Sequence, residues 1–322
     1  MNLNKGPAAG LRVEILLSTH NGAEFLNAFM SSLVDQDEGG WSLTVRDDGS
    51  SDNTVEMLRT WAGRLEGRIR MIDVESPNLG HVRSFSRLLE ASSAPYVMFA
   101  DQDDVWLPAK VGVTLEAMRS RERVAGAGRP IVVSTDAVLV DKDLRVIGLT
   151  AWESQGRVGS GSSGFARVIV ENVVLGCTAM LNRPLVELIH TIPPEALYHD
   201  WWIALVASAF GDVVSLAEPS ILWRRHGSNE SDHSDLRLIL AKVLANPLAG
   251  RRRLQQLFSE GRPRVAAFLH RYGDRLRPDQ KAAAEAYMRL LERGFLARRM
   301  DVVRHGLYFA APLRNAGLLA LL

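Results

Sequence analysis

Three acidic side chains stand within four positions at the end of an apolar run. Residues 96–100 are apolar, and Asp101, Asp103 and Asp104 follow directly. Clustered carboxylates repel one another and lose hydration when buried, so a metal ion, an arginine or solvent must offset their charge. Asp101 and Asp103 are two residues apart, and Mg²⁺ or Mn²⁺ accepts such ligands together with substrate phosphates. The pattern therefore points to a site for a metal-bound diphosphate.

A second acidic pair, Asp47 and Asp48, is followed by Gly49 and Ser50. In one interpretation, one of these carboxylates accepts a hydrogen bond from the ring N–H of a pyrimidine. In the other, the four residues form a turn and a helix cap, for which Asp, Gly and Ser are common. The residues alone leave both interpretations open.

Short apolar runs alternate with helical patterns through the first hundred residues. Strands are expected over 13–18, 42–47, 68–74 and 96–100, and helices over 24–34, 52–65 and 82–92. Strands separated by helices of this length predict βαβ units, a mostly parallel sheet and an α/β fold. Ligands bind outside the carboxyl ends of such strands. The polar segments that follow the four strands are therefore expected to meet at one rim.

The pattern changes along the rest of the chain. A strand or hairpin is expected over 130–141, a strand over 172–182, helices over 183–192 and 200–211, and two short strands around Pro219. From about residue 235 the composition turns to Arg, Leu, Ala and Gln with helical periodicity. We therefore expect a first domain over 1–234 and a helical C-terminal region over 235–322.

Composition excludes several classes of protein. The formal net charge of the 322 residues is +1, so no global field attracts nucleic acid. Cys177 is the single cysteine, which rules out an intramolecular disulfide and a multi-cysteine zinc site. The first ten residues lack the apolar core of a secretory signal, and no run reaches the ~18 apolar residues of a membrane span. These features predict a cytoplasmic protein.

The last seventeen residues, 306–322, are apolar and follow a group of arginines at 293, 298, 299 and 304. Three interpretations of this tail are open: a docked terminal helix, peripheral contact with the inner face of the cell membrane, or a homodimer interface.

Four motifs carry a resemblance to a known family. They are LLSTHNGAEFL, VRDDGSSDNT, NLGHVRSFSRLLEAS and YVMFADQDDVWLPAK, in this order. Together they resemble family 2 glycosyltransferases, which have the GT-A fold. The later motifs YHDWWIALVASAFG and LWRRHGSN are similar to those of the bacterial rhamnosyltransferase-like branch. The resemblance covers about residues 11–230 and leaves the helical tail outside.

The resemblance implies an inverting transfer of a sugar from a nucleotide-diphosphate donor to a hydroxyl of a growing cell-surface glycan. The branch favours dTDP-rhamnose as donor, with UDP-sugars as the alternative, and a glycan or lipid-linked glycan as acceptor. By position, Thr19, Asn21 and Asp48 would contact the nucleoside, with Asp47 close by.

The same resemblance assigns the metal and the base. Residues 101–103 match the metal-binding DxD pattern, so Asp101 and Asp103 would bind Mg²⁺ or Mn²⁺, with Asp103 as the direct ligand. His226 matches a late histidine that completes the metal or diphosphate site. Asp200 falls where the family has its catalytic base, although the usual Glu-Asp pair is His199-Asp200 here.

Two arginines precede that late histidine. Arg224 and Arg225 would either add positive charge near the departing diphosphate or form a solvated strand end. The residues leave both interpretations open.

Two other classes of protein fit part of the pattern. In a phosphatase of the haloacid dehalogenase type, Asp101 would be the nucleophile and Asp103 an acid. That motif normally opens the first strand of its domain, whereas three βα units precede it here. A non-catalytic nucleotide-sugar-binding protein is the second alternative, and it would have no need of a base at Asp200.

Overall fold

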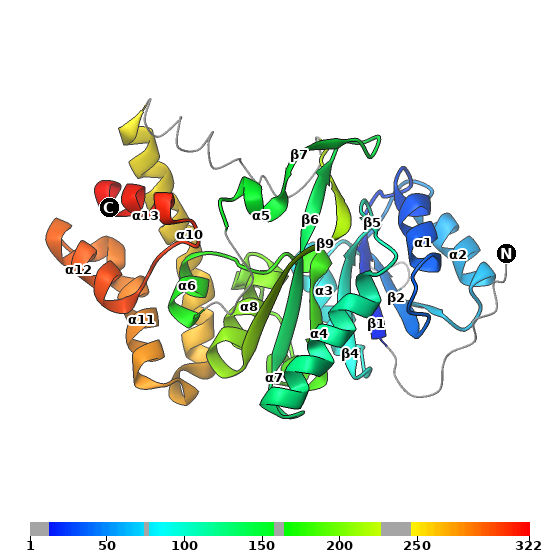
Figure 1. Ribbon diagram of the computed structural model, residues 1–322, viewed down its shortest axis with the longest axis horizontal. Coiled ribbons are helices and arrows are strands. Elements are labelled where there is room, and N and C mark those ends of the chain that lie inside the picture. Colours follow the sequence, from blue (N-terminus) through cyan, green and yellow to red (C-terminus); the bar gives the residue numbers. More distant parts are fainter. Residues whose placement is uncertain (1–12, 74–76, 158–163, 227–245) are drawn as a thin grey trace.

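The computed structural model of the chain describes residues 13–73, 77–157, 164–226 and 246–322 (Figure 1). Within these ranges a mixed sheet carries helices on both faces. The C-terminal helices α11 to α13, within residues 278–321, lie at the end of the molecule away from α1 and α2, within residues 26–64. The predicted α/β fold with a helical C-terminal region is therefore confirmed.

The sheet has nine described strands. They are β1 Val13–Thr19, β2 Trp41–Asp47, β3 Ile69–Ile72, β4 Tyr96–Asp101, β5 Val105–Trp106, β6 Ile131–Val140, β7 Val146–Thr150, β8 Met180–Asn182 and β9 Asp212–Arg224. Their order is β3-β2-β1-β4-β8-β6-β9-β5, and β7 pairs with β6. Strands β1 to β4 are mutually parallel, whereas β8 is antiparallel to both of its neighbours.

The described ranges also contain α-helices. They are α1 Leu26–Val34, α2 Thr54–Arg64, α3 His81–Glu90, α4 Lys110–Ala125, α5 Ala151–Ser154, α6 Phe165–Val170, α7 Arg183–Ile189, α8 His199–Phe210, α10 Pro247–Tyr272, α11 Pro278–Arg289, α12 Phe295–His305 and α13 Pro312–Leu321.

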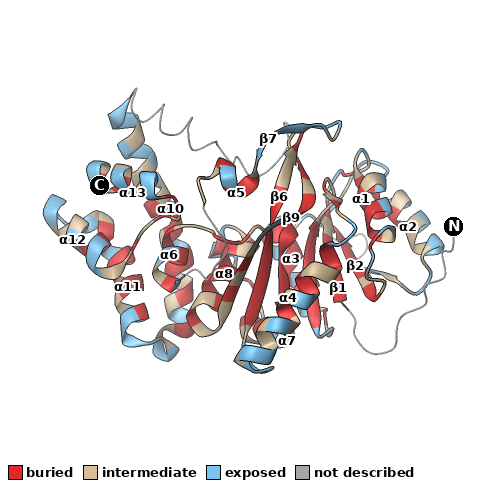
Figure 2. Cartoon of the chain, viewed as in Figure 1, coloured by how far each residue is buried: buried red, intermediate tan, exposed pale blue. Residues whose placement is uncertain are grey.

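The central strands are apolar on both sides because helices cover both faces of the sheet. Ile15 and Leu17 of β1 point into the cluster that also contains residues of α1, α2 and α4. Leu16, between them, points into the cluster of α3, α7 and α8 on the other face. Figure 2 shows the buried strands between helices whose outer sides are exposed.

The second cluster continues into the C-terminal helices. Phe258 and Phe268 of α10, Tyr287 of α11 and Val302 of α12 belong to it. Helix α10 begins after Asn246, whose side chain accepts a hydrogen bond from the Ala249 amide at 3.0 Å. The terminal helix α13 is docked, with Leu318 buried. The predicted boundary between domains, 234/235, lies outside the described residues and stays a prediction.

Three details of the predicted elements were wrong or missing. Helices α4, α5 and α6 and strands β5 and β7 had no counterpart among the expected elements. The expected strand over 172–182 is a strand only at Met180–Asn182, preceded by a 3-10 turn at Gly176–Thr178, because an apolar run without alternation does not separate strand from other buried backbone. The two strands around Pro219 are one strand, β9, whose register with β6 shifts on either side of Pro219. A proline fits such an irregularity because it cannot donate to the ladder.

None of the helices in the described ranges combines the length and apolar character that crossing a membrane requires.

The turn from α8 into β9 depends on a glycine. A Cβ added at Gly211 would lie 1.8 Å from the carbonyl oxygen of Pro130. We predict that Gly211→Ala lowers the free energy of unfolding by about 1–3 kcal/mol, because backbone must shift to admit the methyl group. Gly63→Ala, in exposed α2 where a Cβ meets nothing within 4 Å, is the control and should be stabilising by about 0.5–1 kcal/mol. Urea unfolding of both variants measures this, and equal midpoints would contradict it.

Candidate active site

A cleft of about 1090 Å³ opens at the carboxyl ends of β1, β2 and β4, as the rim prediction requires. The sheet, α3 and α8 form one part of its wall, and α10 and α13 form another. Seven residues singled out from the sequence line it: Thr19, Asn21, Asp48, Asp101, Asp103, Asp200 and His226. The other three, Asp47, Arg224 and Arg225, are not among its described lining residues.

Asp47 serves the turn that follows β2. Its Oδ1 accepts hydrogen bonds from the hydroxyls of Thr19 at 2.8 Å and Ser50 at 2.6 Å. Its Oδ2 accepts from the backbone amides of Gly49 at 3.2 Å and Ser50 at 2.8 Å. The carboxylate therefore does what the turn interpretation requires. It holds Thr19 and the 47–50 turn against each other below the cleft.

Asp48, in contrast, lines the cleft, and hydrogen bonds from the protein fix its carboxylate. Its Oδ1 accepts from the Leu79 amide at 2.7 Å, and its Oδ2 accepts from the Gly80 amide at 2.9 Å. Arg46, which is fully buried, pairs with the same carboxylate. These contacts tie the end of β2 to the start of α3. Sequence reasoning missed Arg46, for which a lone charge within an apolar strand was the available signal.

Asn21 joins the loops after β1 and β2. It adopts a left-handed conformation with φ of 46°, which Asn tolerates better than most residues. Its side-chain oxygen accepts a hydrogen bond from the Ser51 backbone amide at 2.8 Å, and its backbone amide donates to the Ser50 hydroxyl at 2.9 Å. The three predicted nucleoside contacts thus lie on one hydrogen-bonded rim.

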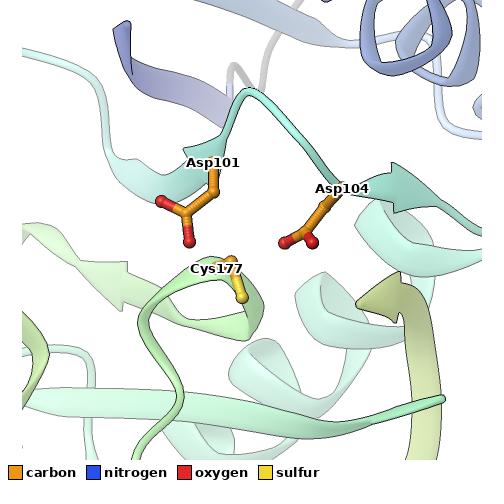
Figure 3. Close-up of side chains that lie close together, drawn as sticks. All are labelled: Asp101, Asp104 and Cys177. Carbon is orange, nitrogen blue, oxygen red and sulfur yellow. The ribbon is translucent and has the colours of Figure 1, made fainter. Parts of the chain in front are cut away.

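The acids at the end of β4 divide into two groups, and Figure 3 shows one member of each, Asp101 and Asp104. Asp101 and Asp103 line the cleft. Asp104 is fully buried below them, where its Oδ1 accepts from the Arg224 amide at 3.2 Å. Burial, together with the charges of Asp103 and Asp101, raises the pKa of Asp104 well above its usual value. Asp101 and Asp103 are therefore the acids of this segment that a ligand in the cleft would meet.

Asp101, Asp104 and Cys177 bring ligand atoms within 4.8 Å of one another. Burial raises the pKa of the Cys177 thiol well above its usual value, as it does for Asp104. A thiol or carboxyl that holds its proton more tightly is a poorer metal ligand. Lys110 is buried nearby, and its Nζ donates to the Cys177 carbonyl at 2.8 Å, so Asp104 and Cys177 belong to the packed interior under the rim, whereas Asp101 lines the cleft.

Residues at the end of β9 contact residues just after β4. His226 Nε2 lies 2.8 Å from Asp103 Oδ2 although 123 residues separate them. Arg224 Nε donates to the Asp103 carbonyl at 2.8 Å, and its guanidinium lies over the ring of Phe25. Arg224 is 4 % exposed, so it supports the rim from below, and Arg225 stacks over Trp223.

The donor set fits a hard divalent cation. Asp101 and Asp103 line the cleft and would supply carboxylate oxygens, and His226, whose Nε2 lies beside Asp103, would supply an imidazole nitrogen. Oxygen ligands of this kind suit Mg²⁺ and Mn²⁺, and Mn²⁺ also accepts imidazole. A cation here would also offset the negative charge that raises the pKa of Asp104.

Asp200 lies in the first turn of α8 and lines the cleft. Its Oδ2 accepts from the Gly176 amide at 2.9 Å, and its Oδ1 receives no hydrogen bond from the described residues. Burial raises the pKa of Asp200 to about 6, and the Gly176 hydrogen bond opposes that shift. A carboxylate with a pKa close to the working pH is suited to general base catalysis.

His199, the departure from the usual Glu-Asp pair, is an interior side chain. Its ring lies 4.1 Å from that of Phe85 and 5.1 Å from that of Phe99, between centroids. Burial lowers the pKa of His199 to about 3, so the imidazole is neutral. A Cβ at Gly176 would approach His199 Nε2 to 2.7 Å, so the backbone that holds Asp200 must be glycine there.

The C-terminal helices complete the wall, which the sequence did not indicate. Leu254, Leu257 and Glu260 of α10 and Leu318 of α13 line the cleft. Arg264 of α10 is fully buried, with its guanidinium carbon 3.3 Å from the centroid of the Trp201 ring. No motif marks these residues, because their role depends on how α10 packs against α8.

The architecture is that of GT-A transferases. It is similar to S. aureus TarS residues 1–349, solved in complex with UDP-GlcNAc among other states, with a TM-score of 0.56 and 13 % identity over 94 % of this chain and 82 % of that one. It is also similar to the mannosyltransferase PcManGT of Pyrobaculum calidifontis in complex with GDP-Man and Mn²⁺, with a TM-score of 0.52 and 17 % identity over 96 % and 74 %.

Residues 14–184 match the model of glycosyl transferase family 2, and the chain belongs to this family. Among curated relatives, it is 23 % identical over 172 residues to the putative teichuronic acid biosynthesis glycosyltransferase TuaG of Bacillus subtilis, over 53 % of this chain and 62 % of that one. It is 24 % identical over 105 residues to the dTDP-rhamnosyl transferase RfbG of Shigella flexneri, over 32 % and 36 %. The chain thus matches less than two thirds of the length of these relatives.

The raised pKa of Asp200 has a consequence for stability. A carboxyl that binds its proton more tightly when folded contributes stability at low pH, and that contribution is lost as pH rises through about 6. We predict that the free energy of unfolding of Asp200→Asn, relative to that of the native protein, rises by about 2 kcal/mol from about pH 4.5 to about pH 7.5. Urea unfolding of both proteins at the two pH values measures this. A difference that does not change with pH would contradict the assignment.

Proposed function

We propose that this protein transfers a sugar from a nucleotide-diphosphate donor to a hydroxyl of a cell-surface glycan, with inversion at the anomeric carbon. One observation carries the proposal. A single cleft receives Asp101, Asp103 and His226 from the sheet and Asp200 from α8. This arrangement supports a site for a metal-bound diphosphate beside a desolvated base, which are the two parts that the reaction needs.

The donor would lie along the sheet rim. Asp48 and Asn21 would contact the nucleoside, and Asp101, Asp103 and His226 would hold the metal and the diphosphate. When bound, a divalent cation supplies positive charge to the diphosphate as it departs. Arg224 and Arg225 would act only from behind the rim, because they hold the strand end.

Asp200 would remove the proton from the acceptor hydroxyl. A hydroxyl is a weak nucleophile at neutral pH, so a carboxylate must take its proton as the attack develops. The acceptor oxygen forms a bond to the anomeric carbon from the face opposite the diphosphate. The bond to the diphosphate breaks with its electron pair, and the proton remains on Asp200. One displacement inverts the anomeric carbon without a covalent enzyme intermediate.

We favour dTDP-rhamnose as donor, with a UDP-sugar as the alternative. RfbG is named a dTDP-rhamnosyl transferase, and TarS was solved with UDP-GlcNAc. The name of TuaG supports a cell-envelope glycan as the acceptor class. Calorimetric titration with dTDP-rhamnose, dTDP-glucose, UDP-glucose, UDP-GlcNAc and GDP-mannose, with and without Mg²⁺ or Mn²⁺, tests the donor. Failure of every donor to bind folded protein would overturn the proposal.

Donor binding should depend on Asp103. We predict that Asp103→Ala abolishes the metal-dependent part of donor binding in calorimetry, because it removes the carboxylate that lies beside His226. Asp279→Ala, which removes an exposed acid of α11, is the matched control and should bind as the native protein does. Unchanged metal-dependent binding by Asp103→Ala would remove this residue from the site.

Asp200 should matter for turnover and not for donor binding. We predict that Asp200→Asn binds donor with native affinity and loses at least about a hundredfold in transfer, the lower end of general base contributions. In the native protein the transfer rate should decrease as the pH is lowered through about 6, because Asp200 becomes protonated. Radiolabelled-sugar transfer across pH measures both effects, and normal turnover by Asp200→Asn would refute the base assignment.

A further inference from the structure

Helix α12 carries an apolar face that the fold leaves outside. Phe295, Leu296, Met300 and Val303 are 62 %, 71 %, 69 % and 57 % exposed. Successive helical residues advance by about 100°, so these four lie within about 140° of the helix surface. Asp301, on the other side, is buried. An exposed apolar stripe of this kind marks an interaction surface, because an amphipathic helix normally turns its apolar face inward.

Basic residues surround this face. Residues 246–322 contain 15 Lys and Arg against 6 Asp and Glu, a formal charge of +9, whereas the whole chain carries +1. On α12 itself, the Arg299 guanidinium lies 3.5 Å from the centroid of the Phe295 ring, and Arg304 is exposed. Apolar side chains interleaved with arginines on one helix are typical of helices that lie in the surface of an anionic bilayer.

We propose that the exposed face of α12 docks this protein onto an anionic lipid membrane. A second copy of the chain is a poorer occupant, since it would bring a second region of the same +9 charge against the first. A bilayer surface rich in anionic headgroups offsets that charge, and its acyl region takes up Phe295, Leu296, Met300 and Val303. The free energy of docking then has both an apolar and an electrostatic part.

The docked helix is linked to the cleft through α13. Arg298 Nη1 donates to the Leu322 carbonyl at 2.8 Å, and Arg299 Nη2 donates to the Ala320 carbonyl at 3.1 Å. Leu318 and Leu321 of α13 line the cleft. Docking through α12 therefore holds one wall of the cleft close to the membrane, where an acceptor carried on a lipid would be met. The docking itself does not depend on the proposed transfer reaction.

The test is sedimentation of the full chain with vesicles. We expect binding to phosphatidylcholine vesicles that contain about 30 % phosphatidylglycerol, weaker binding as salt rises, and little binding to pure phosphatidylcholine. Leu296→Asp combined with Met300→Asp should weaken binding at least about tenfold. Ile147→Asp, at an apolar residue of β7 that is 51 % exposed, is the control and should bind as the native protein does.

Folding and donor binding separate this proposal from the previous one. The double variant should keep the native melting temperature and native donor affinity in calorimetry. If the double variant unfolds, Arg304→Glu tests the electrostatic part by the same assay and should weaken binding to the anionic vesicles. Native protein that fails to bind anionic vesicles, or variants that bind as well as native protein, would overturn the proposal. So would light scattering that shows a dimer dissociated by the double variant without any vesicle binding.

Discussion

Negative charge at the end of a buried strand is the constraint on which the rest of the site depends. Strand β4 lies between β1 and β8 and ends in Asp101, with Asp103 and Asp104 just beyond. The structure offsets these acids with groups from far along the chain. The Arg224 amide meets Asp104, the Arg224 side chain meets the Asp103 carbonyl, and His226 meets the Asp103 carboxylate. Strand β9 must therefore end against β4, which places its last residues at the cleft.

The same physical effect gives two carboxylates of the cleft different properties. Asp103 keeps contact with solvent and with His226. Asp200 is desolvated and receives one backbone hydrogen bond, so its pKa rises toward neutrality. Environments that separate the pKa values of acids in one site also separate their chemical roles. The neutral, stacked His199 beside Asp200 adds no charge that would reverse this effect.

The C-terminal helices belong to the site as much as the sheet does. Their apolar residues share one cluster with α6, α8 and a face of the sheet. Arg264 of α10 is buried over the ring of Trp201 of α8, the residue that follows Asp200. Glu171 pairs with Arg314 at the start of α13. Removal of these helices would take away one wall of the cleft and expose the apolar side of α8. The excess of positive charge in this region also gives the molecule a polarity along its long axis that its net charge conceals.

Local patterns in the sequence determined the first four strands, the helices between them and the rim where their polar ends meet. They did so because the period of apolar residues reports which side of an element is buried, and parallel strands align their carboxyl ends. The same patterns could not choose between Asp47 and Asp48, which are adjacent. Their roles diverge only because the amides of Leu79 and Gly80 reach Asp48. The short β8 lies in an apolar run whose strand partners are distant in sequence.

Tertiary structure alone decided which distant residues share the cleft. The approach of His226 to Asp103, the pKa of Asp200 and the position of α10 and α13 on the wall all depend on packing between segments more than twenty residues apart. Sequence spacing carries no distance across such intervals. The basic character of the C-terminal region can be seen from the sequence alone. Only the fold turned Phe295, Leu296, Met300 and Val303 outward, because α12 buries its other side against the shared core.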